Sequence, residues 1–263
     1  MFTPPDIAYF SINGFPIYYY GVILALAIFF GIVVSNWIAI KEYYLCGAVP
    51  RVATSIIIGG IAGARLYYCL LNCDVYLSNP IEILALREGG LSIHGAIIGG
   101  VIALLYETKQ YNYNFGKLCD IFAMGLPIGQ AIGRWGNFFN SEAFGTPTDL
   151  PWKMYVKKSF RPDEYFSQEY FHPTFLYESL LDILIFIILY SFILKRYKEN
   201  TGIISASYLI LYSIVRFFIE GMRVDCVKYI WGIPFPQLVS IVIILCSIIF
   251  IIIKYNKLSD DKN

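Results

Sequence analysis

The feature that most constrains this chain is its series of apolar runs, several of which are 18 or more residues long. A helix of about 20 apolar residues is long enough to cross the hydrocarbon core of a bilayer. The chain is 57% hydrophobic and 15% charged, whereas a soluble domain carries about 25% charged residues. The ten-residue alternation of a membrane β-barrel is not seen. The sequence therefore predicts an all-α, polytopic membrane protein.

Seven membrane spans are predicted from the apolar runs, connected by short polar segments. They lie at about 17–40, 52–72, 90–106, 118–136, 173–194, 202–220 and 236–254. We expect one integral-membrane domain over residues 1–263, with a small cap in the polar loop 137–172 and a polar tail at 254–263.

The orientation follows from the density of Lys and Arg, which is higher on the cytoplasmic side. Ten of these residues fall in 39 positions on the side of the C-terminal tail, against seven in about 85 on the other side. The N-terminus and the loop 137–172 are therefore predicted to lie outside, and the tail 254–263 inside. The first Lys or Arg is Lys41, so the basic start of a cleavable signal peptide is missing and the first span is expected to be retained.

Charge and cysteine content exclude several functions. A net charge of +1 gives no electrostatic reason to expect a nucleic-acid partner. The chain has six cysteines without a CxxC pair and only two histidines, so a zinc site is not expected. The cysteines are interpreted as small buried apolar residues.

Small residues recur at a spacing of four within the spans, which is typical of helices that approach closely in lipid. They are Gly59 and Gly63, Gly95 and Gly99, and Gly125, Gly129 and Gly133. Close helix packing explains these glycines without any catalytic role.

Ionisable residues inside membrane spans are costly and therefore mark candidate sites. Most of those in this chain fall near the outer ends of their predicted spans, and Asp120, near the inner face, is an exception. The outer group consists of Tyr20, Arg65, His94, Arg134, Glu178, Arg216 and Glu220, with Asp182 one turn deeper. Arginines, a histidine and carboxylates at one depth predict a site for an anionic lipid head group.

Four of the polar residues near the sixth span share one helical stripe. Tyr212, Arg216, Glu220 and Arg223 follow one another at i, i+4, i+8 and i+11. Glu220 can orient Arg216 through an i, i+4 pair. The alternative is an arginine that merely extends toward the head groups beside a carboxylate partner.

The two histidines are interpreted differently. His94 is either a hydrogen-bonded structural group or, with arginines nearby that keep its ring neutral, a general base. His172 abuts Pro173 at a span start, and a structural role is favoured for it.

Residues 133–145, "GRWGNFFNSEAFG", resemble the signature G-R-x-G-N-F-x-N-x-E-x-x-G of the prolipoprotein diacylglyceryl transferase family, and all eight fixed positions match. Further blocks resemble that family in the same order along the chain. They are "YYYG" at 18–21, "SIHGAIIGG" at 92–100, "HPTFLYES" at 172–179 and "YSIVRFFIEGMR" at 212–223. The resemblance covers nearly the whole chain, except the loop 146–171 and the tail.

The resemblance implies an enzyme that moves the diacylglyceryl group of phosphatidylglycerol to the lipobox cysteine of a preprolipoprotein, with release of glycerol phosphate. This is the first step of bacterial lipoprotein maturation in the plasma or inner membrane. The essential positions of the family fall on His94, Arg134 and Arg216. Its supporting, substrate-binding positions fall on Tyr20, Asn137, Asn140, Glu142, Gly145, Glu220 and Arg223, and Tyr212 shares their stripe.

The chemistry of these side chains fits that reaction. His94 can accept the proton of the attacking thiol, while Glu142 is expected to position a donor rather than act as the base. Arg134 and Arg216 can hold two oxygens of the leaving phosphate. Asn137 and Asn140 can donate to the glycerol of the head group. The scheme requires no metal or redox cofactor.

Two other classes of protein remain open on the residues alone. A secondary transporter also buries charges, but its site lies near the bilayer midplane between internal repeats, and no repeat is found here. A structural or binding membrane protein does not need a histidine and two arginines from three helices. A transferase with another lipid acceptor also stays open.

Overall fold

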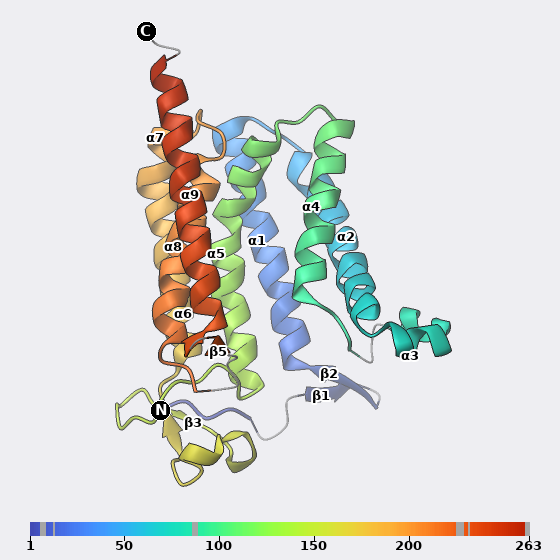
Figure 1. Ribbon diagram of the computed structural model, residues 1–263, viewed down its shortest axis with the longest axis vertical. Coiled ribbons are helices and arrows are strands. Elements are labelled where there is room, and N and C mark those ends of the chain that lie inside the picture. Colours follow the sequence, from blue (N-terminus) through green and yellow to red (C-terminus); the bar gives the residue numbers. More distant parts are fainter. Residues whose placement is uncertain (6–8, 13, 86–88, 225–228, 231, 261–263) are drawn as a thin grey trace. The chain divides into compact units, whose positions relative to one another are not determined.

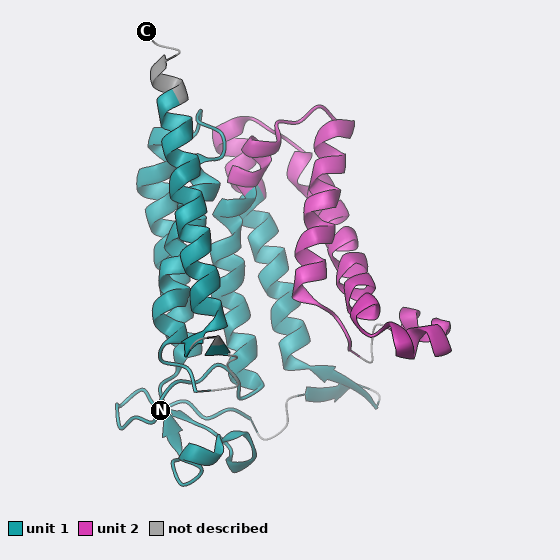
Figure 2. Ribbon diagram, in the orientation of Figure 1, with its two compact units in different colours: residues 1–35, 122–263 teal, residues 36–121 magenta. Residues whose placement is uncertain are grey.

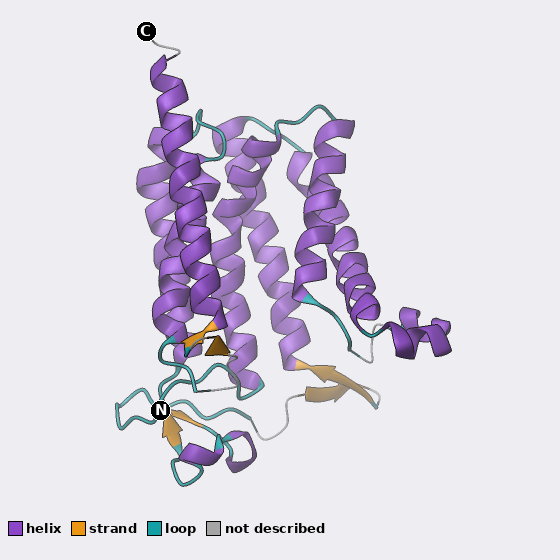
Figure 3. Cartoon of the chain, in the orientation of Figure 1, coloured by secondary structure: helices purple, strands orange, loops and turns teal. Residues whose placement is uncertain are grey.

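The structure is a computed structural model of the chain that describes all residues except 6–8, 13, 86–88, 225–228, 231 and 261–263. The last three of these belong to the predicted tail 254–263. Helices dominate the described residues (Figure 3). An apolar chain in lipid becomes helical because a helix satisfies every backbone N–H and C=O within its own segment. This confirms the predicted all-α class.

A long helix occupies each of the seven predicted spans (Figure 1). Within the described residues these are α1 (Tyr19–Tyr43), α2 (Ala48–Leu71), α4 (Ile93–Gln110), α5 (Phe115–Phe139), α6 (Thr174–Ile188), α8 (Ile203–Glu220) and α9 (Phe235–Asp260). Helix α6 continues through η5 (Leu189–Leu194) and α7 (Lys195–Tyr197).

Five of these helices are long and apolar enough to cross a membrane, and the protein is therefore a multi-pass membrane protein. They are α1, α2, the continuous helix Thr174–Tyr197, α8 and α9. The other two, α4 and α5, contain more glycine and polar residues. That α4 and α5 also cross the membrane, giving seven spans, stays a prediction.

The chain forms two compact units (Figure 2). Unit 1 consists of residues 1–35 and 122–263, and unit 2 of residues 36–121. Unit 2 contains α2 and α4, together with the short helices α3 (Cys73–Ser78) and η1 (Pro80–Leu84).

Glycines let α2 and α4 approach closely within unit 2. A methyl group added at Gly59 would lie 2.8 Å from the Cβ of Ala103, and one added at Gly63 would lie 2.9 Å from the Cα of Gly99. Both distances are too short for real side-chain contacts, so only glycine fits at these positions. The predicted role of Gly59, Gly63, Gly95 and Gly99 in helix packing is confirmed.

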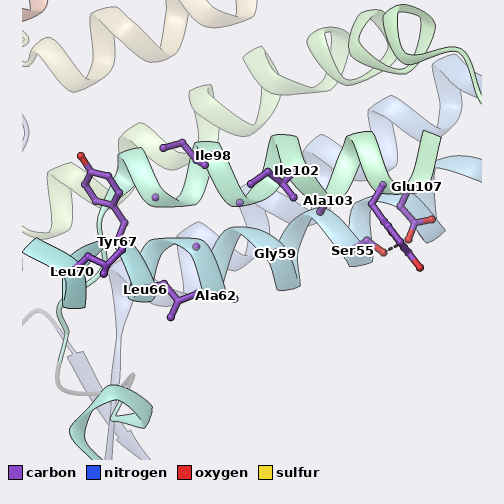
Figure 4. A pocket seen from close by; sticks show the side chains of 14 residues that line it. Ser55, Gly59, Ala62, Leu66, Tyr67, Leu70, Ile98, Ile102, Ala103 and Glu107 are labelled. Carbon is purple, nitrogen blue, oxygen red and sulfur yellow. Dashed lines mark hydrogen bonds between the residues drawn. The ribbon is translucent and has the colours of Figure 1, made fainter. Parts of the chain in front are cut away.

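The small residues leave an apolar groove of about 560 Å³ along α2 and α4 (Figure 4). Large side chains such as Leu66 and Ile102 form its walls. At one end the hydroxyl of Ser55 donates to Glu107 Oε1 over 2.6 Å.

In unit 1, α8 packs against both α6 and α9. Helix α5 approaches α1 at Gly125, where an added methyl group would overlap the backbone of Gly31 and the hydroxyl of Ser35. The glycine spacing of the fourth predicted span therefore also serves close packing. The segment η5, which continues α6 toward α7, has π-helical hydrogen bonding over six residues.

Three small antiparallel hairpins lie at the helix ends of the described chain, and hydropathy did not predict them. They pair β1 (Tyr9–Ile12) with β2 (Phe15–Tyr18), β3 (Met154–Tyr155) with β4 (Tyr170–Phe171), and β5 (Tyr229–Ile230) with β6 (Ile233–Pro234).

The loop 137–172 folds into the small cap that was predicted. It contains β3, β4 and the short helices η3 (Lys158–Phe160) and η4 (Asp163–Tyr165). Its buried Phe144, Met154 and Phe171 form one apolar cluster with Phe138 of α5 and Phe175 of α6. The first residues of the chain are bound to the cap, because the Phe2 N–H donates to the Lys153 carbonyl over 2.8 Å. The cap is thus fixed to the ends of α5 and α6.

Candidate active site

The family-like signature 133–145 begins in the last turns of α5 and continues into a tight turn. Gly136 provides room for the ring of Tyr20, because a methyl group there would lie 2.9 Å from the ring. Tyr20, at the start of α1, therefore lies beside the signature, and its supporting role stays a prediction.

The turn after α5 holds two non-glycine residues in the left-handed region of φ. Ser141 has φ 57° and Ala143 has φ 55°, and both are buried. Such residues are uncommon, cost free energy and cluster at functional sites. The conformation is held by the N–H of Glu142, which donates to the Asn137 carbonyl over 2.9 Å.

The carboxylate of Glu142 accepts hydrogen bonds from both signature asparagines. The Nδ2 of Asn137 lies 3.3 Å from Glu142 Oε2, and the Nδ2 of Asn140 lies 3.3 Å from Oε1. Glu142 therefore orients both amides, which agrees with the positioning role expected for it. The amide oxygens of Asn137 and Asn140 are turned away from this carboxylate.

Gly145 fixes the end of the turn between two other segments of unit 1. Its N–H donates to the His172 carbonyl over 2.9 Å, and the next N–H, of Thr146, donates to the Met222 carbonyl over 3.0 Å. A methyl group at Gly145 would lie 3.0 Å from the Cβ of His172 and from the Met222 carbonyl. Only glycine fits without displacing one of these segments.

His172 has the structural surroundings that were predicted for it. Besides its backbone pairing with the turn, its Nδ1 lies 3.1 Å from the hydroxyl of Tyr177. The indole N–H of Trp152 donates to the same hydroxyl over 2.9 Å.

The centre of the site is a carboxylate on α6 that bridges two arginines. Glu178 Oε2 lies 2.7 Å from a guanidinium nitrogen of Arg134 on α5 and 3.0 Å from one of Arg216 on α8. The side chain of Glu178 is only 1% exposed. One buried carboxylate oxygen thus holds together the two arginines for which the sequence predicts a phosphate-binding role.

The predicted stripe on α8 extends this arrangement. Arg216 also pairs with Glu220, which lies 3.7 Å from Arg223. The hydroxyl of Tyr212 accepts a hydrogen bond from Arg134 over 3.1 Å. These polar contacts form one continuous series, which we call the arginine chain. It consists of Tyr212, Arg134, Glu178, Arg216, Glu220 and Arg223.

The arginine chain is arranged so that its cations remain accessible while its anions are buried. The side chains of Arg134 and Arg216 are each 17% exposed, whereas Glu220 is 3% exposed. Bidentate guanidinium groups favour phosphate and carboxylate ligands. The geometry therefore suits an anion that reaches the arginines from their exposed side.

Two carboxylates of α6 belong to the ionisable residues that the sequence places inside the spans, but no role was predicted for either of them. Nothing in the sequence indicates that Glu178 bridges two other helices. Asp182, one turn deeper, is fully buried, and neither of its carboxylate oxygens has a hydrogen-bond partner among the described residues. The sequence signal for Asp182 is its position inside a predicted span.

His94 lies in unit 2, as the second residue of α4, and its ring is 6.2 Å from that of Tyr67 between centroids. The side chain is exposed. The structure thus brings together the predicted residues of unit 1, and the convergence of His94 with them stays a prediction.

These observations define a multi-pass membrane protein with a buried arginine and carboxylate network suited to an anionic group. The family model of prolipoprotein diacylglyceryl transferase matches residues 7–253. The chain belongs to this family.

Individual relatives support the assignment over most of their length. The chain is 41% identical to the phosphatidylglycerol–prolipoprotein diacylglyceryl transferase of Synechococcus elongatus, over 97% of the chain and 89% of that protein. It is 43% identical to the protein of the same name from Thermotoga maritima, over 90% of the chain and 80% of that protein. The corresponding protein of Synechocystis is 40% identical, over 93% and 87%.

The Glu178 bridge leads to a prediction about stability. Glu178→Gln keeps the size of the side chain but removes its charge, so two buried guanidinium groups lose their shared partner. Removing one member of a buried ion pair costs about 3–5 kcal/mol. We expect a clear fall in the thermal midpoint of the protein in detergent micelles.

The matched control is Glu169→Gln, because Glu169 is 57% exposed and lies 4.0 Å from Arg161. Because the carboxylate of this pair is exposed and only a 4.0 Å contact is made, solvent screens it and the pair contributes about 0–1 kcal/mol, so this variant should melt close to the wild type. Equal midpoints for the two variants would contradict a central role for the Glu178 bridge.

Proposed function

We propose that the protein transfers the diacylglyceryl group of phosphatidylglycerol to a cysteine thiol of a prolipoprotein. The observation that carries the proposal is the pair of arginines that Glu178 holds together, in a chain that matches the transferase family over residues 7–253. The phosphodiester of phosphatidylglycerol is an anion of the kind that guanidinium groups bind.

The reaction forms a thioether bond between the cysteine sulfur and the glycerol carbon of the diacylglyceryl group. The bond between that carbon and the phosphate oxygen breaks, and glycerol phosphate leaves with the bonding electrons. Arg134 and Arg216 stabilise the charge that develops on the leaving phosphate. Asn137 and Asn140, oriented by Glu142, bind the glycerol of the head group.

The thiol must lose its proton before or during the attack. His94, on α4, accepts this proton, since a neutral imidazole is a suitable base near neutral pH. The acceptor cysteine is that of the lipobox, the short motif at the end of a lipoprotein signal peptide. The scheme makes this the first step of lipoprotein maturation and requires no metal or redox cofactor.

The direct test supplies the purified protein with phosphatidylglycerol and a lipobox peptide. A cysteine peptide should gain one diacylglyceryl group by mass spectrometry, with release of one glycerol phosphate. A thiol has a pKa near 8.5 and is partly ionised at neutral pH, whereas a serine hydroxyl is not. The serine form of the same peptide should therefore gain essentially none.

Equal modification of the serine peptide would exclude thiolate attack. Release of glycerol phosphate without modification of either peptide would identify a lipid hydrolase instead.

The role of the arginines predicts a difference between Arg and Lys. Arg134→Lys and Arg216→Lys keep the positive charge but lose the planar fork that holds two phosphate oxygens. We expect each variant to lose about 10²-fold in the rate of transfer, measured as lipidated peptide. Arg196→Lys, at an exposed position of α7, is the control and should keep the wild-type rate. Wild-type transfer by both site variants would remove phosphate recognition from the scheme.

The two histidines offer a matched comparison. His94→Gln cannot take up a proton, so transfer at neutral pH should fall by about 10²-fold or more. The loss should diminish as the pH approaches that at which the thiol ionises unaided. His172→Gln loses only the contact with Tyr177 and should show a smaller loss that does not depend on pH. A full rate for His94→Gln at neutral pH would leave His94 with a structural role.

We further propose that residues 1–263 act as one transferase domain in the bacterial plasma or inner membrane, with the N-terminus and cap outside and the tail inside. The higher density of Lys and Arg on the side of the tail supports this orientation. Phosphatidylglycerol and the secreted peptide then meet at the outer surface.

Two native cysteines can report the orientation of α2. Cys46 precedes this helix and Cys73 follows it, and both are exposed. Two variants are made, in which either Cys46 or Cys73 is the single cysteine of the chain. An impermeant thiol reagent should label Cys73 in intact spheroplasts, but Cys46 only after permeabilisation. The opposite pattern would reverse the proposed topology.

A further inference from the structure

Arg65, on α2, uses its whole guanidinium group to bind the backbone of one segment. An arginine has five N–H donors, and five hydrogen bonds to backbone carbonyls account for them. The Nε donates to Ile83, the Nη1 to Gly89 (2.7 Å) and Gly90 (3.0 Å), and the Nη2 to Glu82 and Ala85 (3.3 Å). All five acceptors lie at residues 82–85 and 89–90, which precede α4.

This arrangement explains how a buried charge is tolerated on α2. Arg65 is only 5% exposed, and its guanidinium also lies 5.2 Å from the centre of the Tyr76 ring. Backbone carbonyls are known partners for arginines within membrane proteins. With its donors occupied, Arg65 does not join Arg134 and Arg216 as a phosphate ligand, although its predicted depth groups it with them.

The segment that Arg65 binds ends four residues before His94. Ser92, which precedes α4, donates its N–H to the carbonyl of Ala64 over 3.0 Å. The ring of Tyr67 faces that of His94 at 6.2 Å. Three neighbouring residues of α2, at 64, 65 and 67, thus contact His94 itself and the chain before it.

Gly90 shows how closely this contact is fitted. Its φ is +73°, and an added methyl group would lie 2.5 Å from the Nη1 of Arg65 and 2.7 Å from the ring of Tyr68. Gly89 also has a positive φ, of +87°, but nothing lies within 4 Å of an added methyl group there. The two glycines share a backbone requirement and both carbonyls accept from Arg65, but only at Gly90 would an added methyl group meet the guanidinium.

We propose that Arg65 is a positioning residue that fixes the backbone before α4 and thereby places His94 for proton transfer. The inference rests on the proposed function, in which His94 is the base. A misplacement of about 1 Å is enough to lower a catalysed rate by about 10²-fold. A cation that binds five carbonyls of one segment provides such placement without contact with the substrate.

The first test is Arg65→Lys, which keeps the charge but offers three donors instead of five. Transfer to the lipobox peptide should fall by about 10- to 10²-fold at neutral pH, with an unchanged KM for phosphatidylglycerol. The loss should diminish at alkaline pH, as for His94→Gln. In the double variant with His94→Gln, Arg65→Lys should cause no further loss, because both act on the same proton transfer.

The second test approaches the contact from the other side. Gly90→Ala should reproduce the pH-dependent loss of Arg65→Lys, because its methyl group displaces the guanidinium. Gly89→Ala, which has the same backbone strain without the clash, should lose less. This pair remains informative if Arg65→Lys fails to fold.

A third measurement does not depend on activity. Hydrogen exchange of the full-length protein in lipid nanodiscs should show faster exchange of residues 89–96 in Arg65→Lys, with residues 134–145 unchanged. Unchanged exchange at 89–96 would overturn the anchoring itself. If the wild type transfers lipid and the losses of Arg65→Lys and His94→Gln multiply, positioning of His94 is overturned. If the wild type transfers nothing, the proposed function fails while the exchange data still decide the anchoring.

Discussion

One carboxylate oxygen shared by two guanidinium groups is the interaction on which unit 1 depends. Charged groups in an apolar interior are tolerated only when they are paired and hydrogen-bonded. Glu178 on α6 supplies that pairing to α5 and α8 at once. The turn at Gly145, which follows α5, joins the same three helix ends again. The N–H of Gly145 donates to residue 172, just before α6, and the N–H of Thr146 donates to residue 222, just after α8. The strained turn and the ion pairs therefore fix each other, and the signature amides of Asn137 and Asn140 keep the orientation that Glu142 gives them.

The two units satisfy their buried arginines by different means. Arg134 and Arg216 bind carboxylates and remain partly exposed, so an incoming anion can share or replace their partners. Arg65 binds backbone carbonyls, which belong to the chain and cannot be exchanged for a ligand. We therefore propose different roles for residues of one type and similar predicted depth: Arg134 and Arg216 recognise a ligand, and Arg65 organises the backbone.

Much of the fold could be predicted because hydropathy acts locally. The predicted spans 173–194 and 202–220 correspond to helices beginning at Thr174 and Ile203, and the stripe from Tyr212 to Arg223 follows from helical periodicity alone. The bridge through Glu178 could not be predicted, since it depends on which helices become neighbours. The left-handed turn at Ser141 and Ala143 was equally hidden, because neither residue type signals a positive φ. Hydropathy also gave no means to separate Arg65, which binds backbone carbonyls, from the arginines that bind carboxylates.

The π-helical segment η5 has a consequence for how the family varies. A π-helical turn accommodates one residue more than an α-helical turn and usually arises by insertion of a single residue. Here it lies at Leu189–Leu194, on the C-terminal side of Glu178 and Asp182 in the same continuous helix. A homologue that lacks one residue in this stretch would revert to regular α-helix while keeping the same faces directed inward on either side. A one-residue gap in an alignment at η5 would therefore leave the carboxylates of α6 at positions equivalent to those in the relatives. A gap between the start of α6 and Glu178 would instead rotate these carboxylates away from the arginines.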